Sequence, residues 1–248
     1  MGTERPQSRI KISKVKIIKR QNFTPDLWVI WIEKPNDFHF KAGQYCTIGS
    51  SGTERAYSIV SAPHEESLEL FIELVPPPEG ILTPKLWELS EGDSVSIRPR
   101  AKGVFTFKPA FRDQLLVSTV TGVVPYISFL RDYIYQGHNG HHFYVLQGAS
   151  YTDEFVYDHE LQDLAEKYPN MITYIPTISR PKEANNQGWE GETGRVNEIC
   201  KKYLDQYGLQ PDGTLIYACG HPDMIEDVKS RFIPIGFKVE EERFWKQD

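Results

Sequence analysis

Hydrophobic positions follow two different periods along the chain, and the change falls near residue 110. Between residues 10 and 99, short stretches of alternating apolar and polar positions are separated by turn residues. This pattern predicts the strands of a small antiparallel barrel. We expect these strands at residues 10–18, 27–33, 43–49, 55–61, 68–75 and 93–99.

One short helix is expected to interrupt the predicted barrel near residue 83. Thr83 is a residue type that caps helices, and Pro84 stands where the first helical turn tolerates proline. The start of a helix can bind an anion. A plug that closes the open end of a barrel explains the same residues, and the pattern alone favours the plug.

After residue 113 the pattern changes to strands that alternate with helices, which requires crossover connections and therefore a parallel sheet with helices on both faces. Ligands of such sheets lie at the carboxyl ends of the strands. We expect strands at 115–120, 143–148, 171–179 and 214–220, and helices at 125–136, 153–168, 194–208 and 224–236. The segments 119–125, 149–151, 179–181 and 219–224 then leave the strands at one edge and converge on one crevice.

The two patterns predict two domains, and a length of 248 residues suits two domains of ordinary size. The fold class that we expect is an antiparallel β-barrel followed by an α/β domain with a Rossmann-like parallel sheet. Their predicted bounds are residues 1–108 and 109–248, and residues 100–112 form the predicted connection.

Composition places the chain among ordinary globular proteins, with 40% hydrophobic and 25% charged residues. The longest uncharged stretch, residues 114–130, contains several polar residues and is shorter than the roughly 20 apolar residues of a membrane helix. The first residues carry charge and no apolar run, which argues against a secretory signal. We expect a cytoplasmic monomer that binds neither a membrane nor nucleic acid.

Candidate metal ligands are few. Cys46, Cys200 and Cys219 are widely separated, so the spacing of an iron–sulfur site is missing from the sequence. His138, His141 and His142 form the one histidine group, and a solvated turn around Asn139 and Gly140 explains them better than metal ligation. We therefore expect no metal site.

Basic residues gather near the N-terminus, although the net charge is −6. Residues 5–20 contain no acid and seven basic residues, namely Arg5, Arg9, Lys11, Lys14, Lys16, Lys19 and Arg20. This basic segment can steer an acidic protein partner. A lysine-rich edge strand that discourages aggregation explains the same residues, and the sequence does not separate the two interpretations.

Candidate binding chemistry begins with RAYS at residues 55–58, where alternation puts Arg55 and Tyr57 on one face and Ser58 on the other. Arginine binds phosphate and tyrosine stacks on a flat heterocycle, but an exposed strand often carries such a pair by itself. Thr121 and Gly122 follow a strand and precede a helix, as in loops that hold a pyrophosphate, although G-x-G-x-x-G is missing.

Two further residues have two interpretations each. Cys219 ends a strand before Gly220, where a planar ligand can approach, but a buried small hydrophobic residue is the commoner role of such a cysteine. Trp245, three residues from the C-terminus, can anchor a last strand by packing or cover a flat ring. The sequence alone leaves both open.

Eight short motifs follow one another in a recognisable order: RAYS at 55–58, ELV at 73–75, GILT at 80–83, TGVVPYISFL at 121–130, SRP at 179–181, TGR at 193–195, CGHPDM at 219–224 and FW at 244–245. Their order and spacing resemble the ferredoxin–NADP reductase family, most closely its bacterial branch. The resemblance extends over nearly the whole chain.

The resemblance implies an FAD-binding barrel, with Arg55 on the pyrophosphate, Tyr57 stacked on the isoalloxazine and Ser58 near flavin N5. It implies that Trp245 shields the opposite face of the flavin and yields to nicotinamide. The full set implied to contact FAD is Arg55, Ala56, Tyr57, Ser58, Glu73, Leu74, Val75, Gly80, Ile81, Leu82, Thr83, Thr121 and Trp245. The resemblance implies catalytic roles for Ser58, Cys219 and Trp245.

The resemblance also implies an NADP(H) site in the second half, where Ser179, Arg180 and Arg195 match positions that bind the 2′-phosphate. Two arginines on one dianion favour NADPH over NADH. The full implied set is Thr121, Gly122, Val123, Ser179, Arg180, Arg195, Cys219, Asp223 and Met224.

The chain departs from the family pattern at four places. Val120 stands where many relatives have glycine, and Pro181 stands where an acid is frequent. Residues 246–248 run past Trp245, where close relatives stop. Arg243 occupies the position, two residues before the aromatic, at which plant-type relatives have a glutamate, so the sequence gives no glutamate a proton-relay role.

The resemblance implies an FAD-dependent oxidoreductase of the ferredoxin/flavodoxin–NADP⁺ reductase type, with hydride transfer between NADP(H) and flavin N5 and single-electron transfer to an acidic ferredoxin or flavodoxin. The alternatives within this fold are the reductase component of an oxygenase or other multi-subunit enzyme, and a free-flavin or ferric reductase. A flavin-binding regulatory module without turnover is the alternative from another class.

Overall fold

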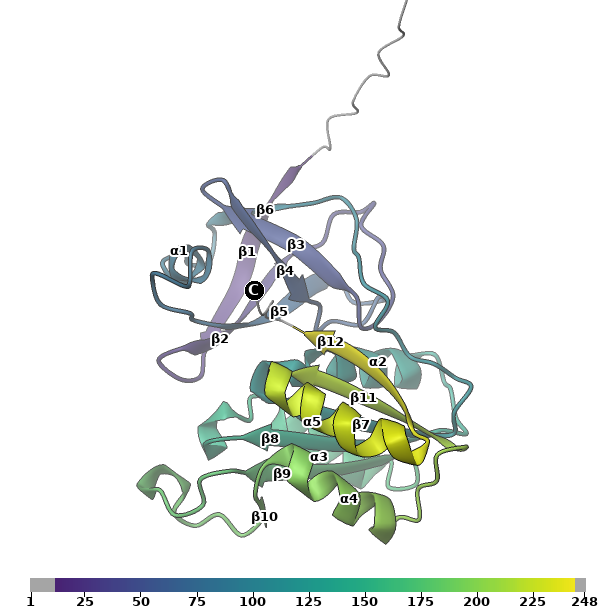
Figure 1. Ribbon diagram of the computed structural model, residues 1–248. Coiled ribbons are helices and arrows are strands. Elements are labelled where there is room, and N and C mark those ends of the chain that lie inside the picture. The colour runs from purple at the N-terminus through teal and green to yellow at the C-terminus, as the bar shows by residue number, and fades with distance from the viewer. Residues whose placement is uncertain (1–11, 244–248) are drawn as a thin grey trace, which may run out of the picture.

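The computed structural model of the protein describes residues 12–243, which fold into two parts that pack against each other (Figure 1). These parts, a barrel and a parallel sheet with its helices, are here called the two layers. The first layer is an antiparallel sheet of strands in the order β4-β3-β6-β1-β2-β5. Contacts between β4 and β5, its two outer strands, nearly close it into the expected barrel. Its strands are β1 (Ser13–Asn22), β2 (Leu27–Glu33), β3 (Tyr45–Ser50), β4 (Thr53–Ser58), β5 (Ser67–Glu73) and β6 (Ser94–Ile97).

Period-2 alternation explains why these residues fill the barrel. Val15 and Ile17 of β1 point inward and are buried, whereas Lys14 and Lys16, which alternate with them, are exposed. Trp28 of β2 is fully buried in the same core. All six strands expected from the sequence are present.

The edge-strand interpretation of the basic segment is wrong. β1 pairs with β6 through residues 13–16 and with β2 through residues 17–22, so it lies inside the strand order and is not the edge strand of the sheet. Lys14, Lys16, Lys19 and Arg20 lie on this inner strand, while Arg5, Arg9 and Lys11 fall outside the described residues. Steering of an acidic partner stays a prediction.

The second layer is a parallel sheet in the order β10-β9-β8-β7-β11-β12. Its strands are β7 (Asp113–Thr119), β8 (His142–Ala149), β9 (Ile172–Ile178), β10 (Glu192–Thr193), β11 (Thr214–Gly220) and β12 (Lys238–Arg243). The helices are α1 (Thr83–Trp87) beside the barrel, then α2 (Val124–Tyr135), α3 (Asp158–Lys167), α4 (Val196–Gln206) and α5 (Pro222–Phe232). None of these described helices is long and apolar enough to cross a membrane.

Helices cover both faces of the parallel sheet, as the sequence predicted. Side chains of α4 and α5 pack on one face, and side chains of α2 and α3 pack on the other (Figure 1). The core around α2 also contains Val29 and Phe71 of the barrel, so α2 is buried between the two layers. A shared apolar core therefore fixes the barrel against the parallel sheet.

A buried ionic cluster crosses the same boundary and is here called the seam: Glu69 of β5, Arg131 of α2, and Tyr157 and Glu160 at α3. Arg131 donates to Glu69 Oε2 at 2.7 Å and to both carboxylate oxygens of Glu160, and Tyr157 donates to Glu69 Oε1 at 2.8 Å. Burial by itself would lower the pKa of Arg131, but its bonds to Glu160 and Glu69 raise that pKa above its ordinary value. The guanidinium is thus held charged between the layers.

The connection between the layers is packed and bonded along its length. Phe105 is 2% exposed and contacts Tyr217 of β11 edge to face, with ring centroids 5.3 Å apart. The Tyr217 hydroxyl accepts from Lys108 N at 2.8 Å and donates to Thr106 O at 3.3 Å. The segment therefore belongs to the interface and does not act as a free tether.

The histidine group lies where the sequence placed a turn, since Gly140 has a φ of +91°. His141 Nδ1 lies 2.8 Å from the hydroxyl oxygen of Tyr133 and its Nε2 lies 3.1 Å from Pro109 O. His142 Nε2 lies 2.8 Å from Thr173 Oγ1. These contacts give His141 and His142 structural partners.

Candidate functional site

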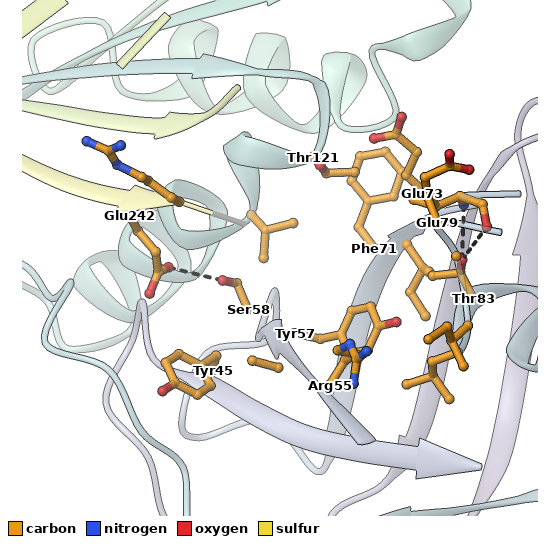
Figure 2. A pocket seen from close by; sticks show the side chains of 18 residues that line it. Tyr45, Arg55, Tyr57, Ser58, Phe71, Glu73, Glu79, Thr83, Thr121 and Glu242 are labelled. Carbon is orange, nitrogen blue, oxygen red and sulfur yellow. Dashed lines mark hydrogen bonds between the residues drawn. The ribbon is translucent and has the colours of Figure 1, made fainter. Parts of the chain in front are cut away.

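A cavity of about 720 Å³ opens between the two layers, and side chains from both line it (Figure 2). This is an ordinary size for a cofactor or small-molecule site. The barrel contributes Tyr45, Arg55, Ala56, Tyr57, Ser58, Phe71, Ile72, Glu73, Val75, Glu79, Gly80, Ile81, Leu82 and Thr83, and the parallel layer contributes Thr121, Val124, Glu242 and Arg243.

The end of β4 forms one wall of the cavity. The ring of Tyr57 is mostly buried, and burial raises the pKa of its hydroxyl while the charge of Arg55 opposes that rise. Arg55 is exposed beside it and, among the described residues, hydrogen-bonds only to the backbone oxygen of Glu54. An aromatic plane next to an arginine that has no acidic partner suits a planar ligand that carries phosphate.

Ser58 lines the same cavity, although strand alternation had placed it on the opposite face. The difference arises because β4 ends at Ser58 and the cavity wraps around the end of the strand. Ser58 is 7% exposed, so its hydroxyl needs a hydrogen-bond partner within the protein.

Glu242 of β12 is that partner and is a functional candidate that the sequence missed. Ser58 Oγ donates to Glu242 Oε2 at 3.1 Å, across the boundary between the layers (Figure 2). Burial raises the pKa of Glu242 to about 7, and the hydrogen bond from Ser58 opposes that rise. The carboxyl group therefore changes protonation near neutral pH, as a group that takes up or releases protons must.

Cys219 lies behind this pair and is fully buried. It pairs in register with Glu242 across β11 and β12, and its side chain packs in the core with Tyr126 and Tyr217. Burial raises the pKa of its thiol well above the ordinary value, and the neighbouring Glu242 adds to the rise. The thiol therefore stays neutral, and it is not among the groups that line the cavity.

The loop after β7 reaches the cavity through Thr121. Gly122 packs so closely on the end of β11 that a Cβ atom there would lie 2.2 Å from the backbone oxygen of Cys219. Val120 has a φ of +39°, in the left-handed region that a β-branched residue rarely occupies. The sequence had marked Val120 as a departure from glycine, and the structure shows the backbone conformation that glycine would adopt more easily.

The predicted flavin contacts are brought together almost completely. Leu74 does not line the cavity and packs against the barrel core, and Trp245 lies outside the described residues. The other eleven residues of the predicted set do line it: Arg55, Ala56, Tyr57, Ser58, Glu73, Val75, Gly80, Ile81, Leu82, Thr83 and Thr121.

Thr83 reaches the cavity in a role that differs from the expected helix cap. The N-cap of α1 is Leu82, and Thr83 is the first helical residue. Thr83 Oγ1 donates to Val75 O at 3.0 Å and accepts from Val75 N at 3.0 Å. It thereby holds the loop of residues 75–83 against the barrel, because its hydroxyl replaces a backbone partner for Val75.

The predicted nucleotide residues follow the carboxyl edge of the parallel sheet in two groups. Ser179, Arg180 and Arg195 are exposed at the outer end, beyond β9 and β10, and Asp223 is exposed at the start of α5. Gly122 and Val123 are buried within the loop after β7, and Met224 is buried in the core between α4 and α5. Met224 therefore packs in the core beneath the carboxyl edge of the parallel sheet and does not face a ligand there.

The residues that the sequence missed lie on neighbouring elements. Phe71 and Glu73 share one face of β5 by alternation, so the expected role of Glu73 was a usable signal for Phe71. Glu242 and Arg243 had no comparable signal, because a run of three glutamates looks like a solvated tail. The residues concerned are Tyr45, Phe71, Ile72, Glu79, Val124, Glu242 and Arg243.

Comparison with known families gives a match to the oxidoreductase NAD-binding domain over residues 116–230. This range contains most of the parallel layer and the loops at its carboxyl edge. The match therefore agrees with the crevice that the alternating strands and helices predicted.

Relatives match most of the chain. A flavodoxin/ferredoxin–NADP reductase of Buchnera aphidicola is 27% identical over 230 residues, which cover 88% of each chain. The flavodoxin/ferredoxin–NADP reductase of Escherichia coli is 27% identical and covers 86% of this chain and 87% of its own. A ferredoxin NADP⁺ reductase from Neisseria gonorrhoeae, solved with FAD and NADP, shares the fold with a TM-score of 0.81 at 23% identity over 96% of this chain and all of its own. The chain is thus similar in sequence to flavodoxin/ferredoxin–NADP reductases over both layers and shares its fold with a ferredoxin NADP⁺ reductase.

Proposed function

We propose that the protein is an FAD-dependent reductase that exchanges electrons between NADP(H) and a ferredoxin or flavodoxin. The observation that carries this proposal is the single cavity in which the end of β4 meets the carboxyl edge of the parallel sheet. A flavin relay requires both sites to open on one space, because hydride transfer needs the two rings in contact.

The residues of the cavity fit FAD. Tyr57 offers an aromatic face, Arg55 offers a cation without an acidic partner in the described chain, and Ser58 with Glu242 offers a polar pair at depth. When bound, FAD supplies the hydride and single-electron chemistry that no side chain provides. We assign the flavin contacts to the barrel, residues 1–108, with Thr121 added from the other layer, and the dinucleotide contacts to residues 109–248.

In this proposal, Tyr57 stacks on the flavin ring and Arg55 binds its pyrophosphate through charge-assisted hydrogen bonds. The backbone of Thr121 and Gly122 receives phosphates of the dinucleotide at the start of α2. Ser179, Arg180 and Arg195 would receive the ribose end.

In this proposal, the Glu242 carboxyl donates and accepts protons in the site, and Ser58 holds it in place. With a pKa of about 7, the Glu242 carboxyl is near half protonation at neutral pH, and Ser58 holds it by donating a hydrogen bond. The pair can therefore supply or accept a proton beside the flavin without a change of structure. The buried thiol of Cys219 stays neutral and fills space behind the pair.

A visible spectrum of the purified full-length protein tests the proposal. We expect flavin bands that bleach under anaerobic titration with NADPH and that return when oxidised ferredoxin or flavodoxin is added. A colourless protein that binds no added FAD would overturn the proposal, and so would a flavoprotein that no nicotinamide dinucleotide reduces.

A further inference from the structure

Arg180 and Arg195 follow the adjacent strands β9 and β10 at the carboxyl edge of the parallel sheet, and their surroundings differ. Gly194 N donates to Ile178 O, and Thr193 pairs in register with Ile178, so the chain at Arg195 runs alongside the chain at Arg180. Arg195 makes no side-chain hydrogen bond or ion pair with residues 12–243. Arg180, in contrast, is engaged by two neighbours.

The two neighbours of Arg180 are Tyr151 and Glu183. Arg180 Nη1 donates to the Tyr151 hydroxyl at 2.8 Å, and the guanidinium carbon lies 5.3 Å from the centre of the Tyr151 ring. The Tyr151 hydroxyl in turn donates to Glu183 Oε2 at 2.6 Å, and Glu183 Oε1 lies 3.7 Å from Arg180 Nη1. A carboxylate therefore already pairs with this arginine, directly through Nη1 and indirectly through the Tyr151 hydroxyl.

Asn186 holds this arrangement in place from below. It is 2% exposed, and its Nδ2 donates to Ser150 O at 2.9 Å and to Arg180 O at 2.8 Å. Its Oδ1 accepts from Thr152 N at 3.0 Å. The backbones on which Tyr151 and Arg180 stand are thus tied to one buried amide, so the two side chains are preorganised as a unit.

An acid at this position has opposite effects on the two dinucleotides. A 2′-phosphate that binds Arg180 comes within the range at which like charges repel, and it must displace Glu183 from Tyr151 and Arg180. A ribose that keeps its 2′-hydroxyl can instead donate to a carboxylate, as in dinucleotide folds that bind NAD.

We infer that Glu183 is a specificity-determining residue: its carboxylate competes with the 2′-phosphate of NADPH for Arg180 and Tyr151 and shifts the preference toward NADH. This inference rests on the proposed function, because it requires a dinucleotide in the crevice. It deepens that function by stating that the two arginines contribute unequally to NADPH binding, with Arg195 available and Arg180 partly neutralised.

Binding of two nucleotide fragments to the flavin-loaded protein tests the inference without turnover. Adenosine 2′,5′-bisphosphate carries the phosphate in question and 5′-AMP lacks it, and isothermal titration calorimetry measures both affinities. In Glu183→Gln we expect the bisphosphate to bind about ten-fold more tightly, since a charge pair at this range is worth roughly 1 kcal/mol in water and the phosphate is a dianion. We expect 5′-AMP to bind no more tightly than to the wild type.

Glu190→Gln is the matched control. Glu190 is exposed in the same loop, and its side chain has no hydrogen bond or ion pair with the described part of the chain. It therefore reports the effect of removing one negative charge at a distance. We expect it to change either affinity by less than about two-fold, because solvent screens exposed charges.

The route through Arg180 is tested by repeating Glu183→Gln in an Arg180→Gln background, where we expect most of the ten-fold gain to vanish. A gain of full size in that background would overturn the competition for Arg180. Equal behaviour of Glu183→Gln and Glu190→Gln in a protein that binds both fragments would overturn the inference and leave the proposed function intact. A wild type that binds neither fragment would overturn both.

Discussion

Two of the arginine–glutamate ion pairs of this protein differ in how far solvent reaches them. In the seam, Arg131 holds Glu69 between the layers, where the Glu69 side chain is 5% exposed. Beyond β9, Arg180 and Glu183 are each 51% exposed. The buried pair is shielded from water and held by further partners within the seam, so it acts in stability. The exposed pair can exchange its partners for water or a ligand, which suits it to selectivity.

The largest effect is expected from breaking the buried pair. Arg131→Met leaves the Glu69 carboxylate buried without its cation, so the free energy of unfolding should fall by about 4 kcal/mol in urea unfolding. Lys201→Met is the control, because Lys201 pairs with Asp205 on the exposed face of α4, and we expect a change below about 0.5 kcal/mol. Similar losses in both variants would remove the distinction between the two regions.

The next effect concerns Glu242, whose folded-state pKa of about 7 lies above its ordinary value of 4.5. A carboxyl whose pKa is raised by folding costs no stability below pH 4.5, and its cost grows as pH rises from 4.5 to 7 and then stays constant. The shift corresponds to roughly 3 kcal/mol. We expect Glu242→Gln to unfold with a weaker pH dependence than the wild type across this window.

Urea unfolding of wild type and Glu242→Gln at pH 5 and at pH 7.5 measures that difference, because other titrating groups cancel in the comparison. Identical pH dependence in the two proteins would mean that the carboxyl is not desolvated as described. The same variant should lose the step near pH 7 in the pH profile of flavin reduction.

A smaller effect is expected at Arg55, which is exposed but lies beside the ring of Tyr57. Arg55→Gln should weaken FAD binding about ten- to hundred-fold, the range for loss of charge-assisted hydrogen bonds to phosphate. Fluorescence of released flavin on dilution measures it. Arg112→Gln, an exposed change at the start of β7, is the control, and equal FAD loss in both would remove Arg55 from the pyrophosphate site.

The smallest effect is expected from Ser58→Ala, which removes the hydrogen bond to Glu242. That bond favours the carboxylate, so the pKa of Glu242 should rise further, by about one unit or less. Carboxyl bands in infrared difference spectra against pH report the titration directly. A downward movement of the pKa would show that Ser58 does not donate to the ionised carboxylate.

Sequence alone gave the architecture because periodicity is a local signal that burial enforces. Alternation located all six barrel strands, and the strand–helix alternation located β7, β8, β9 and β11 with the helices between them. The sequence did not predict β10 or β12. The two residues of β10 are too few to show a period, and β12 is a half-exposed outer strand rich in glutamate, which resembles a solvated tail.

The site residues also fall into those that a local sequence pattern predicts and those that depend on distant contacts. The RAYS motif could be recognised from the sequence because Arg55 and Tyr57 match a family pattern. The hydrogen bond from Ser58 to Glu242 could not, because it joins residues 184 positions apart and depends on the register of β12 against β11. The sequence did not predict a role for Glu183, for a related reason. The family pattern has an acid directly after Arg180, where this chain has Pro181, and the acid that pairs with Arg180 is Glu183, three residues after it.

The packed connection between the layers limits how this protein can be recombined with its relatives. A chimera joined at residue 108 would separate Phe105 from the Tyr217 against which it packs, and would take the two backbone partners of the Tyr217 hydroxyl, at residues 106 and 108, from a different parent. Functional crossovers should therefore lie before Gly103, so that the aromatic segment is inherited together with the parallel sheet. The unit that recombination can exchange intact is therefore the parallel sheet together with the aromatic segment that precedes it.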